Sequence, residues 1–267
     1  MSLLQAFLLG LVQGPAEFLP ISSTGHMVLV SLLSGWPDQG LPFDIAANTG
    51  SLVAVMVALR RDLARLARAW WRSLAAPRPL APEARLVWAV LVATLPAAVA
   101  GFLARDWIVA ETRNVRVIAT ALVGFGVLLG AADLFGRRRR QATELGPAGV
   151  LGVGLAQALA LIPGTSRSGA TMTAGLALGL TREAAARLSF WMAVPIGLLV
   201  AGKNALDLAT GPAAGVADLP ALAIGFAVSA VTSYLAIGWV LAWTRRHSLQ
   251  VFVVYRVLLG LTLLALA

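Results

Sequence analysis

Long apolar runs separated by short polar segments follow one another along the whole chain. Six of these runs approach or reach the roughly 20 residues that a helix needs to cross about 30 Å of hydrocarbon. They lie at about 41–59, 86–104, 117–135, 184–203, 220–243 and 249–266. Two further regions, at about 2–33 and 147–179, are interrupted by turn residues. The pattern predicts an all-α integral membrane protein with six full transmembrane helices.

The first interrupted region is broken at Gly14-Pro15 and again at Pro20. Its apolar halves, about 2–13 and 22–33, are each too short to span a membrane alone. Irregular backbone at membrane depth has to line a cavity enclosed by protein. We therefore expect the two interrupted regions to form re-entrant helix-loop-helix hairpins that meet near the membrane midplane. The alternative for the first region is a single kinked spanning helix of about 30 residues.

The two interrupted regions resemble each other at a fixed offset of 144 positions. The shift aligns Gln13 with Gln157, Ser22 with Ser166, Thr24 with Ser168 and Gly25 with Gly169. We divide the single membrane domain, residues 1–267, into two repeats at about 1–136 and 146–267. Because three predicted spans separate the hairpins, the repeats are expected to be antiparallel in the membrane, which is an inverted-topology repeat.

Composition and charge support a multi-pass membrane protein. The chain is 59% hydrophobic and 12% charged, whereas a soluble domain is about half apolar and a quarter charged. The net charge is +9, but the arginines cluster directly after apolar spans, as expected of cytoplasmic loops. That distribution argues against a nucleic-acid partner and predicts external segments at 34–40, 105–115 and 204–219. The chain has no cysteine, which excludes disulfides and thiolate metal sites.

Both interrupted regions re-enter a helix at a turn rich in hydroxyls and glycine. Ser22, Ser23 and Thr24 are expected to open one helix, and Ser166 and Ser168 the other. The free N–H groups and positive dipole ends of these helices would then face each other, which makes an anion site that suits phosphate.

Arg167 offers a planar fork that can bind two phosphate oxygens. The alternative for Arg167 is a structural ion pair with Glu17 or Glu183. Ser23 lies about one helical turn before His26, within reach for activation as a nucleophile, and Glu17 would orient the imidazole or bind a metal. The plainer alternatives are that the serines only cap the helix and that His26 is a packing residue.

The two turns carry long sequence motifs. Residues 18–26 read Phe-Leu-Pro-Ile-Ser-Ser-Thr-Gly-His, preceded by Gln13 and Glu17, and residues 163–171 read Pro-Gly-Thr-Ser-Arg-Ser-Gly-Ala-Thr. In these motifs the chain resembles the undecaprenyl-pyrophosphate phosphatase family, also called the bacitracin-resistance protein family. The resemblance implies an enzyme of the bacterial cytoplasmic membrane that removes the terminal phosphate from a C55 polyprenyl diphosphate. The product would be the lipid carrier for cell-wall precursors, and the active site would open to the external face.

By the same resemblance, the catalytic residues are Glu17, Ser23, His26 and Arg167. The substrate-binding positions are Gln13, Ser22, Thr24, Gly25, Gly164, Ser166, Ser168, Gly169 and Thr171. The family is associated with a divalent cation, Mg²⁺ or Ca²⁺. Many members look to have Glu where this chain has Gln13, so Glu17 would be the remaining metal ligand, together with substrate phosphates and water.

Several choices stay open at this point. The nucleophile is Ser23, His26 or a water molecule, and Ser23 would be assisted by His26 or Glu17. The expected partners are a polyprenyl diphosphate, membrane lipids and, as one oligomeric state, a second copy in a homodimer. A transporter or flippase of an anionic lipid is the rival function, because inverted repeats with broken helices are also a transporter plan.

Overall fold

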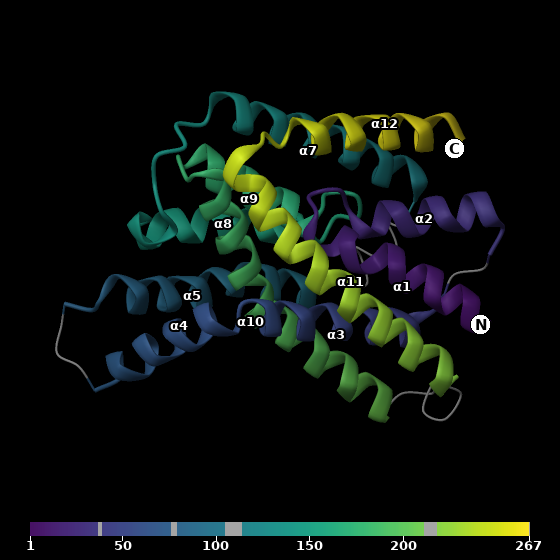
Figure 1. Ribbon diagram of the computed structural model, residues 1–267, viewed down its shortest axis with the longest axis horizontal. Coiled ribbons are helices and arrows are strands. Elements are labelled where there is room, and N and C mark those ends of the chain that lie inside the picture. Colours follow the sequence, from purple (N-terminus) through teal and green to yellow (C-terminus); the bar gives the residue numbers. More distant parts are fainter. Residues whose placement is uncertain (37–38, 76–78, 105–113, 211–217, 267) are drawn as a thin grey trace.

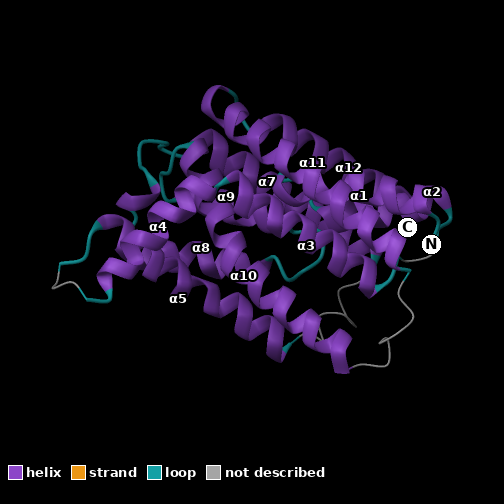
Figure 2. Cartoon of the chain, turned by 60° about the horizontal axis from the view of Figure 1, so that its bottom comes forward, coloured by secondary structure: helices purple, strands orange, loops and turns teal. Residues whose placement is uncertain are grey.

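The computed structural model describes residues 1–36, 39–75, 79–104, 114–210 and 218–266, and these ranges are helical without a β-strand (Figures 1 and 2). The predicted external segments fall partly outside them. In chain order, the helices are α1 (Leu3–Phe18), α2 (Ser23–Ser34), α3 (Leu41–Ala58), α4 (Arg60–Ser73), α5 (Pro82–Leu103), α7 (Val115–Phe135), the 3₁₀ turn η1 (Ala142–Glu144), α8 (Pro147–Leu159), α9 (Arg167–Ala177), α10 (Arg182–Thr210), α11 (Leu219–Arg246) and α12 (Gln250–Leu266).

Five of the described helices are long and apolar enough to cross a membrane, namely α3, α5, α7, α10 and α11. The predicted spans thus coincide with helices, and the all-α membrane class is confirmed. The sixth predicted span is α12, which has 17 residues and belongs to the shorter apolar helices together with α1, α2 and α8. A count of six full spans therefore stays a prediction.

The first interrupted region is a helical hairpin. The chain reverses between Leu19 and Ser22, and α2 packs beside α1 (Figure 1). Ser22 is the N-cap of α2, which begins at Ser23 as predicted, and Gly35 ends the helix in the left-handed conformation. This geometry excludes the single kinked spanning helix.

The predicted break at Gly14-Pro15 is wrong, because α1 continues through both residues to Phe18. The reason is tertiary packing against α11. The hydroxyl of Ser233 donates to the carbonyl of Gly14 at 3.1 Å, and Thr232 is 3.4 Å from the carbonyl of Gly10. These contacts hold α1 against α11 over the stretch that contains Pro15, so packing keeps the helix intact although the proline leaves the carbonyl of Leu11 without its helical donor.

The second interrupted region forms α8, a turn and α9. The short α9 is enclosed by α7, α8 and α10, and residues 168–172 are all buried. Phe18 at the end of α1 and Phe190 on α10 meet edge to face beside it, with ring centroids 5.3 Å apart. The turns before α2 and α9 are thereby held together in the interior of the bundle.

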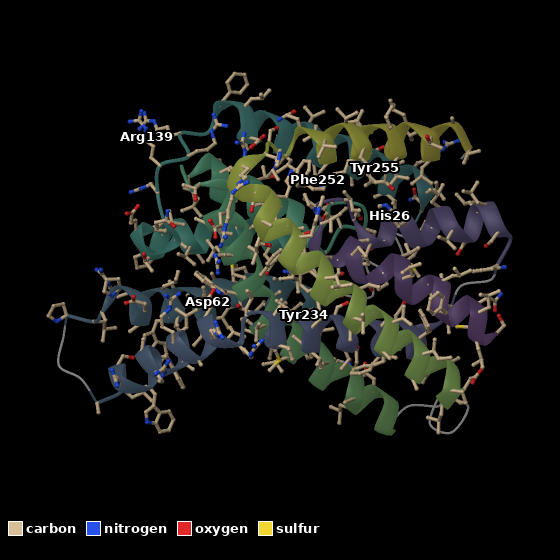
Figure 3. All side chains as sticks on the ribbon, in the orientation of Figure 1. His26, Asp62, Arg139, Tyr234, Phe252 and Tyr255 are labelled. Carbon is tan, nitrogen blue, oxygen red and sulfur yellow. The ribbon has the colours of Figure 1, made fainter. Side chains whose placement is uncertain are left out.

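The basic segment after α3 was expected to be a loop, and this is wrong, because residues Arg60–Ser73 form α4. Leu59, Leu63, Leu66 and Trp70 recur at helical spacing and give the segment one apolar face, which packs against α5. Asp62 on this helix pairs with Arg187 of α10 (Figure 3 labels Asp62). The helical period was present in the sequence but was overlooked beside the run of arginines.

Gly154 on α8 provides a test of helix packing. A methyl group there would lie 2.2 Å from the carbonyl oxygen of Ala93 on α5, whereas one at Gly152, two residues earlier, would meet nothing within 4 Å. We expect Gly154→Ala to lower the free energy of unfolding by about 1–3 kcal/mol, because α5 has to move. Gly152→Ala is the matched control and should raise it by about 0.5–1 kcal/mol through helix propensity. Thermal unfolding in detergent measures both, and equal effects would contradict the packing.

Candidate active site

The turns before α2 and α9 have the same unusual backbone conformation. Ser22 has φ 71° and ψ 101°, and Ser166 has φ 68° and ψ 115°. In the described ranges only one other non-glycine residue, Arg138, has positive φ. Each serine side chain accepts from a backbone N–H three residues later, Gly25 at 3.4 Å and Gly169 at 3.2 Å. Such conformations cost about 1–3 kcal/mol and are typical of functional sites.

A cavity of about 170 Å³ lies between the two turns. Seven of the predicted site residues line it: Glu17, Ser22, Ser23, Thr24, Gly164, Ser166 and Arg167. The other residues that line the cavity are Ala16, Ala160, Ile162 and Pro163. The structure therefore brings most of the predicted residues from both repeats to one enclosed space.

Glu17 links the two turns. Its carboxylate accepts from the hydroxyl of Ser23 at 3.1 Å and from Nη2 of Arg167 at 3.3 Å. Arg167 also donates from Nη1 to the backbone carbonyl of Ser189 at 3.2 Å. The ion pair weighed as the alternative for Arg167 is thus present, yet both side chains also line the cavity. A carboxylate within hydrogen-bond reach of a serine hydroxyl has the geometry of a general base with its nucleophile.

His26 lies outside this cavity. Its Nδ1 is 2.7 Å from the carbonyl oxygen of Ser22, and its Nε2 is 2.7 Å from the hydroxyl of Tyr255 on α12. The two rings are stacked with centroids 5.5 Å apart (Figure 3). Nδ1 facing a carbonyl has to donate, so Nε2 of a neutral ring accepts from Tyr255. The structure therefore pairs Ser23 with Glu17, and His26 supports the Ser22 turn.

Other predicted binding residues brace the site. Gln13 donates to Asn48 of α3 at 3.0 Å, and Ser168 donates to the carbonyl of Leu19 at 3.0 Å. Thr171 donates to the hydroxyl of Ser189 at 2.7 Å. Gly25 and Gly169 contribute the capping N–H groups described above. None of these five lines the cavity between the turns.

Arg256 on α12 is a residue whose place the sequence analysis did not identify. It is fully buried and donates to the carbonyls of Pro20 at 3.1 Å, Gly164 at 3.2 Å and Thr165 at 2.8 Å. It therefore ties together both turns from a helix far along the chain. An arginine inside an apolar span was the available signal, because such a charge needs a partner.

The charges around the turns favour an anion. Among the residues that line the cavity, Glu17 is acidic and Arg167 is basic, and the buried Arg256 adds a second positive charge behind the turns. Within the described ranges no three acidic, histidine or cysteine side chains gather into a metal site. A divalent cation here would have Glu17 as its protein carboxylate and would need phosphate oxygens and water as further ligands, a set that Mg²⁺ accepts.

A larger groove adjoins the cavity, and Arg167 lines both. The groove has a volume of about 840 Å³, lies between α5, α8 and α10, and is lined mainly by apolar residues such as Phe102, Leu161 and Leu199. Arg167 and Ala160 line both spaces. Lys203 and Asn204 add polar groups to the groove. The site thus combines a small polar cavity with a long apolar groove.

Known proteins match this chain over nearly its whole length. The family model for the bacitracin resistance protein BacA matches residues 6–262. The undecaprenyl-diphosphatase of Magnetococcus marinus is 49% identical, and the match covers 99% of both chains. The undecaprenyl-diphosphatase of Nitrosococcus oceani is 47% identical over 97% of both chains, and undecaprenyl-diphosphatase 2 of Stutzerimonas stutzeri is 45% identical over 100% of this chain and 98% of its own. With a match over nearly its whole length, this chain belongs to the BacA bacitracin resistance protein family.

Proposed function

We propose that this protein hydrolyses undecaprenyl diphosphate to undecaprenyl phosphate and inorganic phosphate in the bacterial cytoplasmic membrane. The activity would recycle the lipid carrier for peptidoglycan synthesis and confer bacitracin resistance. The observation that carries the proposal is the cavity between the two turns, where a Ser23–Glu17 pair, Arg167 and two helix N-termini converge. The names of full-length relatives support the same substrate.

The two spaces suit the two parts of the substrate. The diphosphate head occupies the cavity, where N–H groups and guanidinium donors offset its charge. The prenyl chain lies in the apolar groove between α5, α8 and α10 and continues into lipid. Arg167, which lines both spaces, contacts the terminal phosphate, the one that is transferred.

Ser23 is the nucleophile and Glu17 its general base. Glu17 takes the proton from Ser23 Oγ, which attacks the terminal phosphorus while the bridging P–O bond breaks and the lipid monophosphate leaves. Arg167 and the helix N-termini stabilise the charge that moves onto phosphoryl oxygens. Glu17 passes that proton to the departing lipid monophosphate. It then deprotonates a water molecule that attacks the phosphoserine, and it returns the proton to Ser23 Oγ as the serine–phosphate bond breaks. A divalent cation held by Glu17 and the diphosphate would neutralise further charge. The pairing of Ser23 with Glu17 favours this route over attack by His26.

The two repeats are inverted in the membrane, and the site opens to the external face. Three observations support this part of the proposal. Ser22 and Ser166 have the same backbone conformation and both cap the helix that follows. Gly10 and Gly154 are also 144 positions apart, and each lies close to a helix of the other repeat. Correspondingly, α1 packs on α11 and α8 packs on α5. The arginine clusters after α3, α7 and α11 favour a cytoplasmic position for those helix ends.

Phosphate release from a polyprenyl diphosphate by the purified protein tests the function, with Mg²⁺, Ca²⁺ or EDTA present. Ser23→Ala should lower kcat about 1,000-fold, or roughly 4 kcal/mol, and acid quenching should trap phosphoserine only in the wild type. Ser34→Ala, at the far end of the same helix, should keep wild-type activity. Full activity of Ser23→Ala would exclude Ser23 as nucleophile. Folded wild type that moves the lipid across liposomes without releasing phosphate would instead establish transport.

A further inference from the structure

Gln157 on α8 is a buried amide without a hydrogen-bond partner. Its side chain is 2% exposed, and neither Nε2 nor Oε1 is bonded to any part of the chain that the structure describes. A buried polar group left unsatisfied costs about 1–3 kcal/mol. Gln13, the equivalent residue of the first repeat, is also buried but donates to Asn48. Of the two equivalent glutamines, Gln157 is therefore the one whose amide is unsatisfied.

Gln157 lines the groove close to the residues that the groove shares with the phosphate cavity. Gln157 lines the groove between α5, α8 and α10. Ala160 follows three residues later and therefore lies on the same face of the helix. It lines both spaces. Arg167 likewise lines both. Gln157 is therefore about one helical turn from a residue that lines both spaces.

The contents of the two spaces indicate which part of the substrate lies next to Gln157. The terminal phosphate of the proposed substrate occupies the cavity and the prenyl chain occupies the groove, so the phosphate attached to the lipid lies at the junction. A neutral amide can donate to a phosphoryl oxygen through Nε2 while Oε1 accepts from water. Unlike a second cation, it does so without adding charge to an apolar wall.

We propose that Gln157 binds the lipid-linked phosphate, the one that remains on the leaving group. This inference rests on the proposed function and adds a second phosphate subsite to it. Gln157 is then a specificity residue that distinguishes a diphosphate from a single phosphate and retains the monophosphate product. The unsatisfied amide is explained because its partner is the substrate.

Product inhibition separates the two subsites. Farnesyl monophosphate carries the lipid-linked phosphate, whereas inorganic phosphate occupies the cavity between the turns. In Gln157→Met, which keeps the side-chain length and removes both polar groups, Ki for farnesyl monophosphate should rise tenfold or more. Ki for inorganic phosphate should stay within twofold of the wild type. Gln157→Glu should raise Ki for farnesyl monophosphate further, because its carboxylate repels the phosphate.

Thermal unfolding supplies the second readout. Gln157→Met should unfold at the wild-type temperature or above it, since it removes an unsatisfied buried amide. Gln13→Met should unfold at a lower temperature, because it leaves Oδ1 of Asn48 without the donor that it has in the wild type. Equal Ki values for farnesyl monophosphate in Gln157→Met and wild type would overturn the proposal. So would weaker binding of both inhibitors together with a lower unfolding temperature, which indicates a structural role. Absence of phosphate release from both undecaprenyl diphosphate and farnesyl diphosphate by the folded wild type would instead refute the proposed function itself.

Discussion

Replacing Arg167 with alanine should lower kcat/KM for the polyprenyl diphosphate by a hundredfold or more, which corresponds to about 2.7 kcal/mol or more of lost transition-state stabilisation. Arg167 lines both the phosphate cavity and the groove, and it is the basic residue of the cavity. Its guanidinium can hold two phosphoryl oxygens as the bridging bond breaks. Its removal would also leave Glu17 without the cation that it contacts at 3.3 Å.

The measurement is phosphate release by wild type, Arg167→Ala and Arg167→Lys under one metal condition. Lysine keeps the charge but loses the planar fork, so an intermediate loss is expected. Arg65→Ala is the control, because Arg65 is a mostly exposed arginine of α4 with a surface ion pair to Asp62. Arg167→Ala with activity within threefold of the wild type would remove Arg167 from the site.

Replacing Arg256 with methionine should destabilise the protein and inactivate it together. Arg256 donates to three backbone carbonyls that belong to both turns, and it has no exposed surface. Each carbonyl left without a donor costs about 1–3 kcal/mol, so a total loss of roughly 3 kcal/mol or more is expected. Because the turns carry Ser23 and Arg167, their release should also misplace the catalytic groups.

Thermal unfolding and phosphate release at low temperature, measured on the same samples, test this role of Arg256. Arg246→Met is the matched control, since Arg246 is an exposed arginine at the end of α11 and its change should stay within about 0.5 kcal/mol. Arg256→Lys should fall between the two, because an ammonium keeps the charge but reaches fewer carbonyls. An Arg256→Met protein that unfolds at the wild-type temperature with full activity would contradict the tie between the turns.

The fold was predictable where local sequence decides it. Apolar runs of membrane length predicted α3, α5, α7, α10 and α11, and the serines at positions 22 and 166 predicted where α2 and α9 begin. Two local predictions failed, one at Pro15 and one in the segment that forms α4. Pro15 should end a helix, but packing on α11, with hydroxyl contacts to the carbonyls of Gly10 and Gly14, holds α1 together there. The segment that forms α4 was predicted to be a loop because of its arginines. It is a helix whose apolar face packs against α5.

The sequence by itself determined the class of protein and the ingredients of the site. Length of apolar runs, helix caps and motif residues depend on neighbours only a few positions away, so they can be read from the chain. Only the tertiary structure decided which ingredients meet. Ser23 pairs with Glu17, His26 turns to Tyr255, and Arg256 joins the turns across 236 and 92 positions of sequence. These contacts depend on how α1, α9 and α12 pack together. The spacing of residues along the chain does not determine how close they lie in the folded protein.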